Sequence, residues 1–117
     1  MKHHKKGRKF GRVKKVRVAL MRSLARALVL NGKIETTVAK AKELRPFIEK
    51  MITISKKDSV SSRRLVESRM GNDKEVSKKL HEEIAPKYKE RSGGYTRVIK
   101  LGSKADTSND KAVIEFV

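Results

Sequence analysis

Residues 16–55, VRVALMRSLARALVLNGKIETTVAKAKELRPFIEKMITIS, determine the order of the first three secondary structure elements. Apolar side chains recur at helical spacing as far as Leu30. Asn31 and Gly32 then predict the end of the helix, because both residues tolerate the left-handed conformation found there. The side expected to face a core holds Leu20, Met21, Leu24, Ala27 and Leu28. The opposite side holds Lys15, Arg22 and Arg26. We therefore expect one face of this helix to pack and the other to meet anions.

A short strand and a second helix are predicted after Gly32. Residues 33–37 alternate and contain β-branched side chains, which favours a strand. Thr36 or Thr37 can cap the helix that follows, and its apolar positions continue at helical spacing to Ser55. Because Pro46 cannot donate a hydrogen bond to the carbonyl four residues earlier, we expect a kink or a restart near residues 44–46.

The remainder of the chain predicts two further helices and two strands. Ser59 or Ser61 can cap a helix that ends at Gly71, and Asn72 with Glu75 forms a capping-box pattern for a helix ending at 85–86. Residues 87–94 are interpreted as a basic linker, residues 95–101 and 112–117 as antiparallel strands, and residues 102–111 as a loop. The expected fold is α+β, with about four helices packed on a small three-stranded mixed sheet and a basic extended N-terminal arm.

Positive charge is concentrated at the N-terminal end. The chain has 117 residues and a net charge of +18, and residues 1–34 hold twelve Lys and Arg but no acid. A segment so poor in apolar residues cannot offset the entropy of ordering its backbone, so we expect residues 1–15 to be an arm that is disordered when free and residues 16–117 to be a single domain. The candidate binding residues of the arm are Lys2, His3, His4, Lys5, Lys6, Arg8, Lys9, Arg12, Lys14 and Lys15.

Several classes of function do not fit the composition. The chain has no cysteine, which excludes disulfide scaffolds and sites with cysteine ligands. Its apolar stretches are too short and too charged to span a membrane. The three histidines have no neighbouring ligands at metal-binding spacing, and Glu82 and Glu83 are adjacent, so they cannot flank one bond. We therefore expect no enzyme activity, no cofactor, no metal, no membrane partner and no small-molecule substrate.

Folded RNA is the polyanion that best matches the basic residues. The basic face of the first predicted helix carries Lys and Arg but no exposed Asn or Gln. This composition favours contacts with phosphate groups over contacts with the edges of bases. Only Phe10, Tyr88 and Tyr95 lie in basic surroundings, so stacking on single-stranded bases has little support. The alternative from another class is an architectural DNA-binding protein of the nucleoid type, which would dimerise and bind duplex DNA.

The chain resembles the family of bacterial large-subunit ribosomal protein seventeen over essentially its whole length. The similarity rests on the order and spacing of short motifs. These motifs are Met1-Lys2-His3, Gly7-Arg8-Lys9, Arg12, Arg17, Arg22, Gly32-Lys33-Ile34-Glu35-Thr36-Thr37, Lys40-Ala41-Lys42-Glu43-Leu44-Arg45, Asp58-Ser59-Val60, Arg63-Arg64-Leu65 and Gly93-Gly94-Tyr95-Thr96-Arg97.

The resemblance implies a structural, non-catalytic component of the cytoplasmic large ribosomal subunit. By the family pattern it would bind 23S rRNA near the polypeptide exit, beside other large-subunit proteins, as a monomer within the ribosome. The family pattern also implies contact residues in the arm, in the first helix and in the body of the protein. Beyond the arm, the resemblance points to Arg17, Arg22, Thr36, Thr37, Lys40, Lys42, Tyr95 and Arg97.

Overall fold

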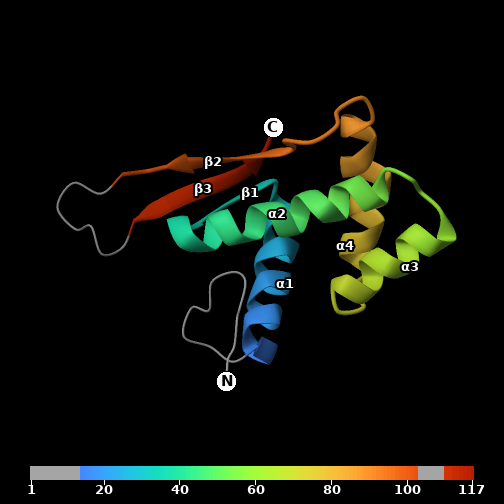
Figure 1. The fold of residues 1–117 in the computed structure, drawn as a ribbon, viewed down its shortest axis with the longest axis horizontal. Helices are drawn as coiled ribbons and strands as arrows, with labels where there is room; N and C mark the ends of the chain where they lie inside the picture. Colours follow the sequence, from blue (N-terminus) through green and yellow to red (C-terminus); the bar gives the residue numbers. More distant parts are fainter. Residues whose placement is uncertain (1–13, 103–109) are drawn as a thin grey trace, which may run out of the picture.

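Helix α2 (Val38–Ser55) lies at the centre of the computed structural model, which describes residues 14–102 and 110–117 (Figure 1). Thr37 is its N-cap and accepts a hydrogen bond from the Lys40 N–H at 3.2 Å, so Thr37 rather than Thr36 caps it. The helix continues through Pro46, and the predicted restart is wrong. Leu44 and Ile48 are buried on the two sides of the proline, and their packing keeps the helix continuous.

Helix α1 (Lys14–Asn31) and strand β1 (Lys33–Thr37) precede α2. The predicted helix end is confirmed: the Gly32 N–H donates to the Leu28 carbonyl at 2.7 Å, and Gly32 has a φ of +86°. Strand β1 has the predicted bounds. Helix α1 crosses α2, and its first turns extend away from the rest of the body (Figure 1).

Helix α3 (Val60–Arg69) packs against α2, and helix α4 (Lys74–Lys79) packs against α3 and α1. Ser59 caps α3, which is one of the two predicted alternatives. The cap of α4 is Asp73, whose side chain accepts from the Val76 N–H at 3.2 Å, so the predicted capping role of Asn72 is wrong. Asn72 has a φ of +65° and belongs to the turn that precedes the helix.

The chain changes its helical geometry after α4. A π-helical turn (η1, Leu80–Ile84) and a 3-10 turn (η2, Ala85–Tyr88) replace the regular helix that the pattern predicts. Leu80 and Ile84 are buried as predicted, and His81 is buried as well, with its Nδ1 2.8 Å from the Ser77 carbonyl one turn earlier. Tyr88, which was assigned to a linker, is also buried.

The sheet has the order β1-β3-β2, with β2 spanning Thr96–Lys100 and β3 spanning Lys111–Phe116. Ile114 of β3 pairs with Ile34 on one side and with Val98 on the other. Both pairings are antiparallel, so the expectation of a mixed sheet is wrong, whereas the α+β class is confirmed. Strands β1 and β2 run in the same direction, but β3 lies between them. The two parallel strands therefore do not pair with each other.

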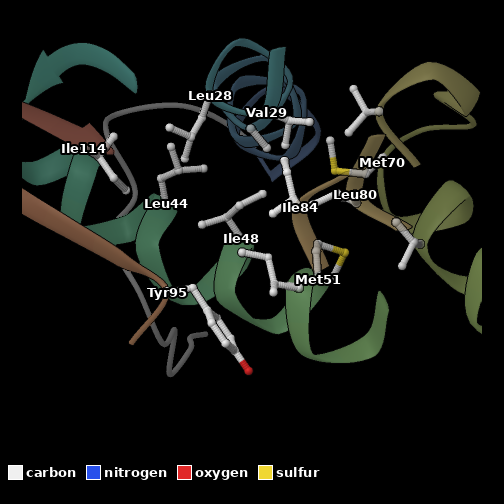
Figure 2. Close-up of a cluster of buried hydrophobic side chains, with 14 of the residues drawn as sticks. Leu28, Val29, Leu44, Ile48, Met51, Met70, Leu80, Ile84, Tyr95 and Ile114 are labelled. Carbon is white, nitrogen blue, oxygen red and sulfur yellow. The ribbon is translucent and has the colours of Figure 1, made fainter. Parts of the chain in front are cut away.

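The core is formed where α1, α2, the η1 turn and one face of the sheet meet (Figure 2). Leu28 of α1, Ile48 of α2 and Ile114 of β3 are fully buried there. Tyr95 lies at the edge of this cluster, with its hydroxyl group pointing away from it (Figure 2). Helix α1 therefore packs on one side of α2, and the sheet packs on another side of α2.

Candidate nucleic-acid interface

The predicted arm leads directly into α1. Residues 1–13 lie outside the described residues, so the structure gives no account of the arm residues Lys2, His3, His4, Lys5, Lys6, Arg8, Lys9 and Arg12. Lys14 and Lys15 form the start of α1 and are exposed. Because the N-terminal end of a helix carries a partial positive charge, it adds to the potential of these two lysines.

The exposed start of α1 also carries apolar side chains. Val16 is 46% exposed and Val18 is 38% exposed, whereas Arg17 between them is half-buried. The described body does not cover this part of the helix, which extends to the lower edge of Figure 1. The first turns of α1 therefore project from the body at the point where the arm joins it.

Arg22 contacts the chain itself rather than pointing freely into solvent. Its Nε donates to the Arg69 carbonyl at the end of α3, at 3.0 Å. The side chain also lies against Gly71, where an added Cβ would come within 3.3 Å of the Arg22 Cδ. Gly71 also has a φ of +72°. Both the short distance to the Arg22 side chain and this left-handed backbone conformation favour glycine at the position.

Arg26 forms ion pairs with two carboxylates of the chain. Its guanidinium group lies 2.6 Å from the Asp73 carboxylate and 2.8 Å from that of Glu75. The hydrogen bond to Asp73, followed by the one to Glu75, raises the pKa of Arg26 above its usual value. The cationic face of α1 is predicted to meet anions, and for Arg26 those anions are Asp73 and Glu75, at the start of α4.

The buried side of α1 is shifted around the helix from the predicted one. Ala25, Leu28 and Val29 are the buried residues, while Leu20 and Ala27 are only partly covered. Helix α1 contacts α2 on one side and α4 on another, so Arg22 and Arg26 lie at a helix interface. Their contacts determine how α1 projects from the body.

The body residues implied by the family resemblance lie in two places. Thr36 and Thr37 end β1, and Lys40 and Lys42 lie in the first turns of α2, where Lys42 is exposed and Lys40 is partly exposed. The Thr37 side chain is already engaged as the helix cap. Because the two elements are consecutive, these four residues lie at one junction.

Tyr95 and Arg97 lie at the start of β2. The Tyr95 ring is buried, and its hydroxyl group forms hydrogen bonds with Thr53 and with the Lys56 ammonium group, both at 3.1 Å. Arg97 is exposed and forms an ion pair with Glu115 at 2.7 Å. The Tyr95 ring is thus positioned to pack inside the protein, whereas Arg97 lies on the surface.

A second basic surface was missed by the sequence analysis. Lys87 lies in the η2 turn, and Lys89 and Arg91 follow it, all three within the segment 87–94 that the sequence predicts to be a linker. The sequence signal is cations at alternating positions around buried Tyr88, but only the tertiary fold shows that this segment is anchored.

The described residues offer little for other kinds of chemistry. Across residues 14–102 and 110–117, no three His, Asp or Glu side chains are grouped so as to hold a metal ion. Of the helices that the structure describes, none is long and apolar enough to cross a membrane.

Comparison with known proteins gives consistent matches. The family model described as ribosomal protein L17 matches residues 20–117. The large ribosomal subunit protein bL17 of Sulfurihydrogenibium sp. (strain YO3AOP1) is 51% identical, over 100% of this chain and 97% of the relative. The bL17 of Persephonella marina is 50% identical over 100% and 95%, and that of Nautilia profundicola is 48% identical over 100% and 98%. The alignments with these relatives include the arm.

Proposed function

Because the chain belongs to the ribosomal protein L17 family, we propose that it is a structural constituent of the cytoplasmic large ribosomal subunit that binds and bridges segments of 23S rRNA. Phosphate and shape contacts would provide the binding, and neutralisation of phosphate charge would support subunit assembly and translation. The role is structural and involves no catalysis.

The observation that carries this proposal is the acid-free N-terminal region and its attachment to α1. Twelve Lys and Arg precede the first carboxylate, Glu35, and the arm continues into the exposed Lys14 and Lys15. A free arm loses backbone entropy when it binds, and an arm fixed to a docked body gains effective concentration. The contacts of Arg22 and Arg26 with the end of α3 and with α4 support this, because they hold the helix that carries the arm.

The proposed RNA contacts extend from the arm to the body. In the arm and α1 they are Lys2, His3, His4, Lys5, Lys6, Arg8, Lys9, Arg12, Lys14, Lys15, Arg17, Arg22 and Arg26. In the body they are Thr36, Thr37, Lys40, Lys42, Tyr95 and Arg97. Of these six proposed contacts in the body, Lys42 and Arg97 are the exposed cations. Neighbouring large-subunit proteins near the polypeptide exit would be the protein partners, and the chain would be a monomer within the ribosome.

A charge-matched pair of variants tests the role of the arm. In the first variant, Lys6, Arg8, Lys9 and Arg12 are replaced by Gln. In the control, the exposed body residues Lys50, Arg64, Lys74 and Lys78 are replaced by Gln. We expect both tagged proteins to show the circular dichroism of the wild type. We expect only the arm variant to be lost from large subunits on a sucrose gradient.

Normal incorporation of the arm variant would contradict the proposed role of the arm. Binding of the wild type to duplex DNA as tightly as to 23S rRNA, without sedimentation with large subunits, would contradict the ribosomal role and favour an architectural DNA-binding protein.

A further inference from the structure

Residues 86–91, which we name the basic turn, have a firmly anchored backbone. The Arg91 N–H donates to the Tyr88 carbonyl at 3.0 Å, which closes the turn. Tyr88 is buried, and its hydroxyl group donates to the Val117 carbonyl at 2.7 Å. The Lys56 ammonium group, at the end of α2, donates to the Arg91 carbonyl. The turn is therefore ordered by its own domain, and a ligand would not need to order it.

The side chains of the basic turn are mostly positive and exposed. Within the part of the chain that the structure describes, the ammonium groups of Lys87 and Lys89 take part in no hydrogen bond or ion pair. Arg91 is exposed, and its Nε donates to the Gly93 carbonyl at 3.0 Å, which leaves the guanidinium charge without a carboxylate partner in that region. Glu90 is the single acid of the turn, so three positive charges stand against one negative charge.

The surface at the basic turn is hollowed on both sides of Pro86 and Lys89. A hollow of about 520 Å³ is lined by residues 86–91 and Val117. A second hollow, of about 170 Å³, shares Pro86 and Lys89 with the first and extends to Lys56 and Ser55. Cationic side chains therefore line both hollows, which lie side by side.

Two residues that line the smaller hollow, Ser55 and Asp58, affect which ligand it can bind. Ser55 is buried, and its hydroxyl group has no hydrogen-bond partner within the described ranges, so it can still donate to a ligand oxygen. Asp58 also lines this hollow, but both of its carboxylate oxygens accept from Arg63, at 2.7 and 3.2 Å. Its negative charge is therefore largely compensated and does not exclude an anion.

The basic turn and the start of α1 lie at opposite edges of the described part of the molecule. In Figure 1 the start of α1 lies at the lower edge and the orange turn that follows α4 lies at the upper edge, with α2 between them. The described residues measure 46 × 37 × 23 Å along their principal axes. The two basic surfaces thus lie apart within the plane of this view, with α2 between them.

We propose that the basic turn is a second phosphate-binding surface, which holds the backbone of an RNA segment other than the one bound by the arm and α1. The inference deepens the proposed function and rests on it, because it identifies the second contact that bridging requires. The Tyr88 ring, the one aromatic group of this described turn, is buried. The ring can therefore neither stack on bases nor anchor a protein partner. The remaining way for this surface to bind RNA is through phosphate contacts by Lys87 and Lys89.

Full-length variants with Lys87→Gln and Lys89→Gln test this surface. The control carries Lys74→Gln and Lys78→Gln, which remove the same charge from exposed positions of α4. Hydroxyl-radical footprinting on 23S rRNA shows which segments each protein protects. We expect the basic-turn variant to lose protection of one segment while the arm-dependent segment stays protected. We also expect its plot of log K against log salt concentration to be shallower by about 1 to 2, because each lost phosphate contact removes about 0.7 to 0.9.

The outcomes separate the two proposals. If the wild type protects no 23S rRNA, the proposed function itself fails. If the wild type binds and the basic-turn variant matches it in footprint and salt slope, the second surface is wrong. An unchanged footprint accompanied by loss of a cross-link to a neighbouring ribosomal protein would also overturn it, in favour of a protein contact. Equal unfolding midpoints of variant and control exclude a folding defect.

Discussion

Glu49 joins helix α2 to strand β2 through one carboxylate oxygen. Its Oε2 accepts from the Thr96 N–H at 3.0 Å and from the Thr96 hydroxyl group at 2.8 Å. Thr96 is buried, so both donors depend on Glu49 for a partner. The same oxygen lies 3.5 Å from the Arg45 Nε, a weaker contact one helical turn away. Glu49 therefore sets the position at which β2 begins on the helix.

Replacing Glu49 tests this role at the level of one residue. We expect Glu49→Ala to lower the free energy of unfolding by about 1–3 kcal/mol, because two buried donors lose their acceptor. Glu49→Gln keeps an acceptor oxygen and should lose less, and Arg45→Ala should have little effect because that ion pair is exposed. Urea unfolding followed by circular dichroism measures all three. Equal losses for the Ala and Gln variants would contradict this account.

The two tyrosines have pKa values shifted in opposite directions, although their ring centroids are only 5.2 Å apart. Burial raises the pKa of Tyr88, and the charge of Arg91 offsets this only in part. Burial acts in the same direction on Tyr95, but its hydrogen bonds with Thr53 and Lys56, together with the Lys56 charge, lower its pKa below the usual value. The pKa values of the two groups differ because Tyr95 has the hydrogen bonds with Thr53 and Lys56 and the nearby Lys56 charge.

Alkaline titration distinguishes the two hydroxyl groups. We expect two steps in the near-ultraviolet absorbance of tyrosinate, one below and one above about pH 10. Tyr95→Phe should remove the lower step and Tyr88→Phe the upper one. Because the pKa of Tyr88 is raised in the folded state, its contribution to stability is present below about pH 10 and is lost as the pH rises through the folded value. A single step in the folded wild type would contradict these assignments.

At the scale of elements, Asp73 is where α1 and α4 are joined. One carboxylate oxygen caps α4 at the Val76 N–H, and the other forms the ion pair with Arg26 on α1. The cap is local, whereas the ion pair spans 47 residues of sequence. Asp73 therefore affects both the stability of α4 and the direction in which α1 carries the arm.

Two substitutions separate these effects. Asp73→Asn keeps an oxygen that can cap the helix but removes the charge that faces Arg26, whereas Asp73→Ala removes both. We expect Asp73→Ala to be less stable than Asp73→Asn by about 1 kcal/mol, the usual contribution of an N-cap. We expect both variants to exchange amide hydrogens faster in α1 than the wild type. Unchanged exchange in α1 would show that the ion pair does not hold this helix.

At the scale of the whole molecule, the charge distribution predicts how RNA binding responds to salt. The N-terminal 34 residues carry twelve of the 31 cations, and the basic turn lies at the edge of the body opposite the start of α1. If about six to ten phosphates are engaged, log K for 23S rRNA should fall against log salt concentration with a slope near −5 to −9. Filter binding over a series of potassium concentrations gives this slope. A flat response would contradict an interface made mainly of phosphate contacts.

Patterns read along the chain predicted most of the elements and the α+β class. The helix end at Gly32 and the cap at Ser59 depend on contacts within a few residues, and strand 33–37 is indicated by its local alternation, so these signals lie in short stretches of sequence. The family resemblance, carried by motifs spread along the chain, indicated the ribosomal family that the comparisons then showed.

Contacts between distant segments decided the rest. The antiparallel sheet depends on β1 and β2 each pairing with β3, and periodicity within one strand does not contain that choice. From the sequence alone, Arg26 is expected to be an unpaired cation. In the fold, the start of α4 brings the Asp73 carboxylate to within 2.6 Å of its guanidinium group. Residues 87–91 belong to the predicted linker 87–94, but in the fold contacts with Lys56 and Val117 hold this segment in place. A side chain's charge is a property of its residue type, but whether that charge is paired or exposed depends on which elements pack beside it.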